Sequence, residues 1–135
     1  MKKLFIDTNI IIDLILKREP FYIEAAKLFS LADKRKIELC VSSLTFATVN
    51  YLMTKVNNAV VARESLVKLK VLVKIADLNE KVIELSLNDK SFSDFEDGLQ
   101  YYSALENESD IIITRNLKDF KNSKLPFMTA ESYLG

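Results

Sequence analysis

Short apolar runs alternate with helix-like segments along almost the whole chain. Strands are expected at Lys3–Ile6, Ile37–Val41, Val71–Ile75 and Asp110–Thr114, with Phe127–Met128 as a candidate edge strand. Helices are expected at Asn9–Leu16, Pro20–Lys34, from Ser42 or Ser43 to Lys55, Val60–Leu69, Glu80–Leu87 and, capped by Asp94, up to Glu106. Such alternation is typical of parallel sheets with helices on both faces. It predicts the α/β class, as a three-layer α/β/α sandwich around a mainly parallel sheet of four or five strands.

The composition narrows the class of protein further. A chain of 135 residues can bury a real core, so we expect residues 1–135 to form one domain. With 49% hydrophobic residues, two Gly and two Pro, disordered and fibrous classes are disfavoured. The 19 basic and 19 acidic residues cancel, so a nucleic-acid partner must meet a local patch. The chain has no His, the commonest general base and metal ligand.

The sequence favours a location in the cytoplasm and no membrane partner. No apolar run approaches the length that spans a bilayer. The start, Met1–Lys3, leads directly into a strand-like run and lacks a small-residue cleavage site. The single Cys40 cannot form an internal disulfide, and we expect it to be a reduced core residue.

Acidic residues follow the expected strands, where α/β sheets place their ligand sites. Asp7 directly follows the first strand, and Asp94 and Asp97 open a later helix. Asp119, together with Asn116, comes shortly after the fourth strand. Because hard cations take oxygen ligands, these side chains indicate a site for Mg²⁺ or Mn²⁺.

Each acid also has an ordinary structural explanation. Asp7 is a good N-cap for the following helix, and capping and function stand at even odds from its own neighbourhood. Asp94 taken alone is better explained as an N-cap, an explanation that is weaker for Asp97. Asp119 could be a solvated loop carboxylate paired with a neighbouring lysine. Asp13 is expected to be a solvated helix residue, not a ligand.

Four motifs, taken in order, resemble the PIN domain family, in particular the toxin subunit of VapBC-type toxin–antitoxin systems. The motifs are Asp7–Asp13, Ser42–Ala47, Asp94–Leu105 and Thr114–Phe120, and they span nearly the whole chain. The resemblance implies a compact α/β/α ribonuclease that clusters three or four acids around Mg²⁺ or Mn²⁺. It also implies RNA as substrate, a homodimer and, for the toxins, inhibition by a small antitoxin protein.

The resemblance also assigns roles to individual residues. Asp7 is the first acid, Asp97 the third and Asp119 the fourth, with Asn116 as the alternative at that position and Asp94 as an accessory ligand. The residues expected to contact substrate are Thr8, Asn9, Ser43, Thr48, Arg115 and Lys118. Among them the two basic residues, with the nearby Lys121, would steer the RNA backbone.

One family acid is missing from this chain. Many members carry Glu three residues beyond the Thr of the second motif, where this chain has Thr48. No Asp or Glu occurs between Leu39 and Arg63. Two divalent ions need several carboxylates, so a weaker site is expected, holding one metal ion, or a reduced or lost nuclease activity. A metal-dependent endoribonuclease therefore competes with a catalytically weak or inactive PIN fold that binds RNA or a partner.

Two further expectations concern other classes and assembly. A receiver-like phosphotransfer domain fits poorly, because Asp77 is the only central acceptor candidate and no Lys follows at a comparable strand end. The helical segments Phe21–Leu31 and Val60–Val67 carry more apolar residues than one small sheet face needs. We therefore expect a homodimer, the alternative being a monomer that buries all of these residues in its core.

Overall fold

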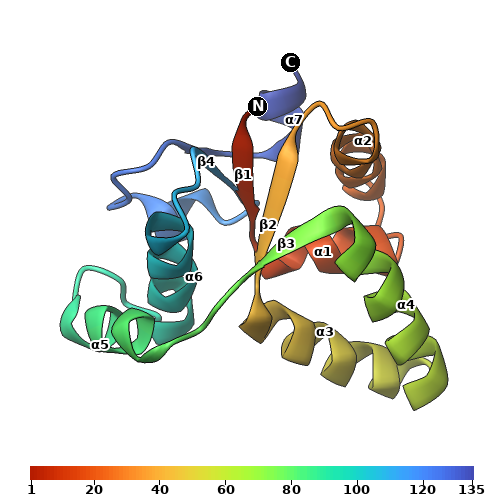
Figure 1. The fold of residues 1–135 in the computed structure, drawn as a ribbon, viewed down its shortest axis with the longest axis horizontal. Helices are drawn as coiled ribbons and strands as arrows, with labels where there is room; N and C mark the ends of the chain where they lie inside the picture. The colour runs from red at the N-terminus through yellow and green to blue at the C-terminus, as the bar shows by residue number, and fades with distance from the viewer.

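The computed structural model describes all 135 residues and has a five-stranded parallel sheet at its centre (Figure 1). The strands are β1 (Lys3–Ile6), β2 (Glu38–Ser42), β3 (Val73–Ala76), β4 (Ile111–Ile113) and β5 (Phe127–Met128). Their order is β3-β2-β1-β4-β5, and every neighbouring pair is parallel. Strand β1 is therefore central, and all strands end at the same edge of the sheet.

Helices cover both faces of the sheet, as Figure 1 shows with α5 and α6 on one side and α1 to α4 on the other. They are α1 (Thr8–Ile15), α2 (Tyr22–Asp33), α3 (Ser43–Val56), α4 (Ala59–Leu72), α5 (Glu80–Asn88), α6 (Phe95–Glu106), α7 (Ala130–Leu134) and the 3₁₀ helix η1 (Leu117–Phe120). This arrangement confirms the predicted α/β/α sandwich. No helix combines the length and apolar character needed to cross a membrane.

The two-residue period of the strands divides the core into two layers. In β1, Leu4 and Ile6 join the larger cluster under α1 to α4, whereas Phe5 joins the cluster under α6. Successive strand side chains point to opposite faces, so a strand that is apolar at every position needs cover on both sides. Cys40 of β2 is a buried core residue as predicted, and burial raises the pKa of its thiol to about 11.

The expected elements are all present, with ends that differ by a few residues. The clearest difference is that α4 continues to Leu72, so Val71 lies in a helix and is 80% exposed, not in a strand. Its β-branched side chain favours strands, but intrinsic propensity is a weak prior that tertiary context overrides. The short α7 and η1 were not predicted.

The register of the sheet determines which side chains meet at its carboxyl edge. Ile6 of β1 is paired with Ile113 of β4, and the Asp7 N–H donates to the Ile113 carbonyl oxygen at 3.0 Å. Asp7 and Thr114, the residues that follow these strands, therefore lie side by side although 107 positions separate them.

Candidate active site

A polar cleft of about 270 Å³ opens beyond the carboxyl ends of β1 and β4. Its walls come from the first turns of α1, α3 and α6 and from the segment around η1. The acidic residues that line it are Asp7, Asp94, Glu96, Asp97 and Asp119, and no Lys or Arg is among the lining residues. A cleft with this lining attracts cations and repels anions unless a cation is bound.

Asp7 is both an N-cap and a cleft residue. Its Oδ1 accepts a hydrogen bond of 2.8 Å from the Thr8 N–H, and its Oδ2 accepts one of 2.7 Å from the Thr114 hydroxyl. The side chain is buried, and this burial raises its pKa, an effect partly offset by the two hydrogen bonds. The structure therefore confirms the N-cap, and the same side chain lines the cleft.

Asp97 lies in the first turn of α6, and the other acids of the cleft affect its pKa. Burial and then repulsion from Asp119, Asp94 and Asp7 raise its pKa to about 7, with a smaller effect of Glu96. The neighbouring Asp94 caps α6 by accepting from the Glu96 N–H at 2.8 Å. Carboxylates that raise one another's pKa are typical of sites completed by a cation.

The fourth acid position has two candidates, Asn116 and Asp119, and both line the cleft. Both residues are exposed, and the Asn116 N–H donates to the Thr114 hydroxyl oxygen at 3.0 Å. The Asp119 N–H in turn donates to the Asn116 carbonyl oxygen at 3.0 Å. The segment after β4 thus brings an amide and a carboxylate to the same side of the cleft.

The donor chemistry of the cleft fits a hard divalent cation in an open site. No three of the acids are preassembled as a metal-ligand cluster in this structure. Two residues that line the cleft, Asn9 and Gln100, each have a buried amide oxygen without a hydrogen-bond partner. Orphaned buried oxygens are rare in proteins and, beside several carboxylates, are oxygens that Mg²⁺ or Mn²⁺ could satisfy.

Comparison with known proteins identifies the family. The model of the PIN domain matches residues 3–118.

The chain belongs to the PIN domain family.

Its relatives include Ribonuclease VapC1 of Aquifex aeolicus (strain VF5), which is 29% identical over 139 residues, covering 98% of this chain and 93% of that protein. A similar solved structure is VapBC-1 from nontypeable Haemophilus influenzae, with a TM-score of 0.73 and 20% identity over 96% of this chain and 98% of that one. A toxin–antitoxin complex from Klebsiella pneumoniae has a TM-score of 0.71 and 23% identity over 94% and 97% of the two chains. These comparisons confirm the resemblance inferred from the four motifs and the fold that it implied.

Asp13 departs from its prediction in this PIN domain. It was expected to be solvated, but its side chain is 0% exposed and pairs with Arg115. The Arg115 Nε donates to Asp13 Oδ2 at 2.7 Å and its Nη2 donates to Oδ1 at 3.1 Å. The guanidinium carbon also lies 4.0 Å from the centre of the Phe21 ring. Arg115 could not be recognised as the partner from sequence, because the two residues are 102 positions apart.

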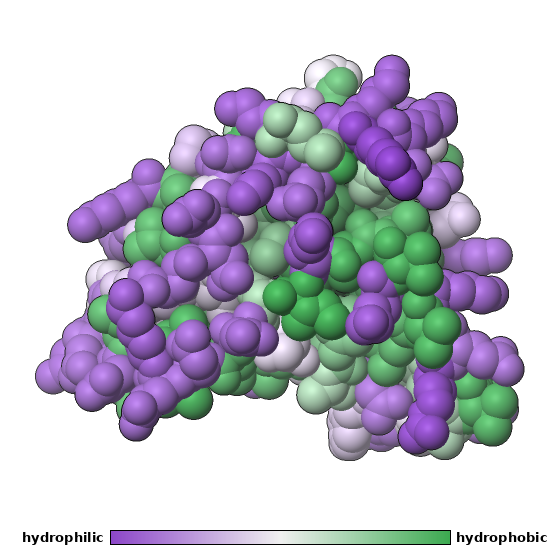
Figure 2. Space-filling model, viewed as in Figure 1, coloured by the Kyte–Doolittle hydropathy of each residue, from purple (hydrophilic) through white to green (hydrophobic).

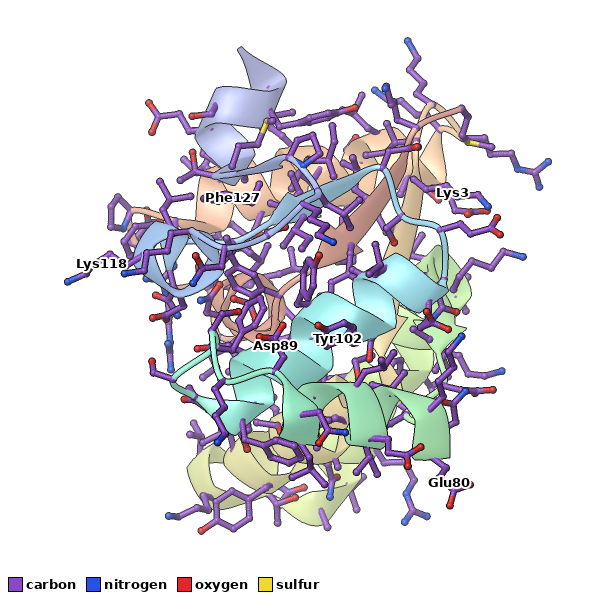
Figure 3. The ribbon with its side chains drawn as sticks, turned by 90° about the vertical axis from the view of Figure 1, so that its left-hand side faces the viewer. Lys3, Glu80, Asp89, Tyr102, Lys118 and Phe127 are labelled. Atoms are coloured by element: carbon purple, nitrogen blue, oxygen red, sulfur yellow. The ribbon has the colours of Figure 1, made fainter.

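The residues expected to contact substrate divide into two groups. Thr8, Asn9 and Thr48 line the acidic cleft. Arg115 lines a different cavity, of about 430 Å³, next to α2 and α7. The Ser43 hydroxyl accepts a hydrogen bond from the Leu78 N–H at 3.2 Å and does not line the cleft. Lys118 is exposed on η1 and projects away from the molecule (Figure 3).

Sequence reasoning missed Gln100 and Glu96 as cleft residues. Gln100 follows Asp97 by three positions, a spacing that places both side chains on one face of α6. That spacing could have identified Gln100 as a cleft residue, but the prediction followed the acidic residues around it.

Proposed function

We propose that this PIN domain is a metal-dependent endoribonuclease and the toxin subunit of a VapBC-like pair. The observation that carries the proposal is the convergence of Asp7, Asp97 and Asp119 on one cleft without a basic residue. The relationship to Ribonuclease VapC1 supports the choice of RNA, because the cleft alone indicates only a cation and a phosphate.

In this proposal Asp7, Asp97 and Asp119 hold Mg²⁺ or Mn²⁺, with Asp94 and Asn116 as accessory ligands. The cation would supply the Lewis acidity for in-line attack of water on a phosphodiester. Asp7 is already oriented by the Thr8 N–H and the Thr114 hydroxyl, so it keeps one geometry before the ion binds. Such preorganisation reduces the reorganisation needed during the reaction.

The proposed RNA contacts come from two regions. Thr8, Asn9 and Thr48 lie inside the cleft, where hydroxyl and amide groups can meet sugar and phosphate oxygens. Lys118 lies on η1, between Asn116 and Asp119 in the sequence, and its exposed side chain can approach the backbone phosphates. Arg115 would join them through the part of its guanidinium that is not bonded to Asp13.

RNA cleavage with Mg²⁺ or Mn²⁺ tests the proposal. We expect cleavage by the wild type, strong loss in Asp97→Asn, and no loss in Asp33→Asn, a matched change at an exposed position of α2. Equal activity of wild type and Asp97→Asn, or activity that survives complete chelation, would contradict the assignment.

A second candidate is a PIN fold that binds RNA or a partner with little or no turnover. It is favoured by Thr48, which stands where many members have Glu and leaves this wall of the cleft without charge. The Thr48 hydroxyl donates to the Leu44 carbonyl oxygen at 3.2 Å. This candidate predicts weak Mn²⁺ binding in calorimetric titrations. Tight binding that Asp7→Asn abolishes would argue against it, and Thr48→Glu should raise the affinity if the family geometry applies.

The proposed assembly is a homodimer that also binds a small antitoxin. Apolar side chains remain exposed on α2 and α4, among them Ile23 at 50%, Val60 at 68% and Val67 at 61%. Figure 2 shows hydrophobic atoms gathered on the side of the molecule where α1, α2 and α4 lie. Exposed apolar surface of this kind is typical of protein interfaces. Sedimentation at micromolar concentration tests the dimer, and a single species of 15.4 kDa would contradict it.

A further inference from the structure

The cleft has one uncharged wall, formed by α3. The α3 residues that line it are Leu44 and Thr48, and the Thr48 hydroxyl is bonded within its own helix. A cation bound in the cleft would therefore meet carboxylates only from the segments around α1, α6 and η1. Any protein oxygen that binds the ion on this side must therefore belong to a residue of another element.

Gln100 reaches this region from α6 and is held in one orientation. It is 5% exposed, and its Nε2 donates to the Thr8 hydroxyl oxygen at 2.7 Å and to the Thr45 hydroxyl oxygen at 3.2 Å. The two hydroxyl oxygens are 2.8 Å apart. These contacts join α1, α3 and α6 at the amide nitrogen of Gln100.

The other end of the same amide has no partner. Gln100 Oε1 is buried without a hydrogen bond, although the residue lines the acidic cleft. A side-chain amide oxygen is a neutral ligand that hard divalent cations accept. Asn9 repeats the pattern, because its Nδ2 donates to Asp7 Oδ2 at 3.4 Å while its Oδ1 has no partner.

We propose that Gln100 is a neutral oxygen donor to the cation site and takes over part of the role of the acid that α3 lacks. The proposal rests on the metal-dependent function proposed above. Thr8 and Thr45 act as positioning residues, because their hydroxyl groups hold the amide so that Oε1 is left for the cleft. A neutral donor adds no negative charge, so the site binds its cation more weakly than one completed by a carboxylate.

Titration of the metal-free protein with Mn²⁺ alone, followed by calorimetry, tests the proposal without an activity assay. Gln100→Met keeps the volume of the side chain but removes the oxygen, and we expect Kd to rise about tenfold or more. Gln100→Glu keeps the oxygen and adds charge, and the Thr8 and Thr45 hydroxyl groups can donate to it. We expect its Kd to fall by about tenfold, which is a change in the opposite direction.

A role in packing alone would not produce opposite changes in the two variants. Thr45→Val is the matched control, because it removes the longer hydrogen bond to Gln100 and leaves Thr8 in place. Its effect on Kd should be smaller than that of Gln100→Met. If Gln100→Met does not fold, Gln100→Glu alone tests the proposal. Its tighter binding should also appear as a larger rise of Tm on addition of Mn²⁺ than the wild type shows.

The failures of the two proposals can be told apart. Equal Mn²⁺ affinity in the wild type, Gln100→Met and Gln100→Glu overturns the role of Gln100 and leaves the metal-dependent function standing. If the wild type does not bind Mn²⁺ and Asp7→Asn gives the same result, the proposed function is wrong, and this inference fails with it.

Discussion

Asp7 and Asp13 are two buried aspartates, 6% and 0% exposed; Asp7 caps α1 and Asp13 lies within it. The charge of Arg115 acts on both, but their hydrogen-bond partners differ. Asp13 forms two hydrogen bonds with the guanidinium group of Arg115. Asp7 accepts only from neutral groups and faces the like charge of Asp119. Burial alone therefore does not mark a functional carboxylate. The informative observation is a buried carboxylate without a bonded cationic partner.

The two environments are also connected through the chain. Arg115 immediately precedes Asn116, and Asp119 follows three residues later. The pair between Asp13 and Arg115 therefore anchors to α1 the segment that carries both candidates for the fourth acid position. We infer that Asp13 supports the geometry of the cleft from behind, while Asp7 takes part in its chemistry.

The largest effect is expected from Asp7→Asn, at the buried carboxylate that has no bonded cationic partner. Asparagine keeps the N-cap but removes the charge that binds the cation. We expect RNA cleavage to fall by on the order of 10²- to 10³-fold, the range for losing one electrostatic stabilising group. Circular dichroism should show an unchanged fold. Retained activity would place the cation away from Asp7.

Arg115→Met should destabilise the fold, because it removes the partner of Asp13. The substitution leaves the Asp13 carboxylate buried without its partner, which we expect to cost about 3 kcal/mol of unfolding free energy. Urea denaturation measures the change. The double variant Asp13→Leu/Arg115→Met should recover much of the loss, since no unpaired charge remains. A double variant as unstable as Arg115→Met would contradict this account.

Asp97→Asn should change how the Tm of the protein depends on pH. Because burial and neighbouring acids raise the pKa of Asp97 from 3.8 to about 7, the fold favours its neutral form. The resulting stability is complete below 3.8 and is lost as the pH rises through about 7. In metal-free protein, the Tm of the variant minus that of the wild type should therefore increase by a few degrees as the pH rises from about 4 to about 8. Asp33→Asn should show no such trend, and a constant difference for Asp97→Asn would argue against the raised pKa.

The smallest effect is expected from Gly98→Ala, directly beside Asp97. A Cβ at this position would lie 3.5 Å from the Ser86 Cβ and 3.7 Å from the Phe92 Cβ, which are ordinary contacts. Alanine is favoured over glycine inside a helix by up to about 1 kcal/mol, so unfolding free energy should rise slightly. Nuclease activity should be unchanged, because Gly98 faces α5 and not the cleft. A loss of activity with unchanged stability would extend the cleft to this position.

Local chemistry determined most of the fold. The bounds of β1 were predicted correctly, and Asn79 and Asp94 cap the helices expected after them. These features depend on hydrophobic period and capping, which act over a few residues and can therefore be read from one segment at a time. The carboxylates of the cleft could be predicted for a related reason, since parallel strands bring their carboxyl ends to one edge.

Tertiary structure alone decided which polar side chains meet. Arg115 pairs with Asp13 across 102 positions, and Gln100 bonds to Thr8 across 92. Each choice depends on the register between β1 and β4 and on how α6 lies against the sheet, to within a fraction of a side-chain length. Residue type and spacing do not contain that information, because one carboxylate or amide can serve a helix cap, an ion pair or a ligand site. The physical reason is that hydrogen bonds and ion pairs act only at short range, so packing selects among partners that the sequence leaves equivalent.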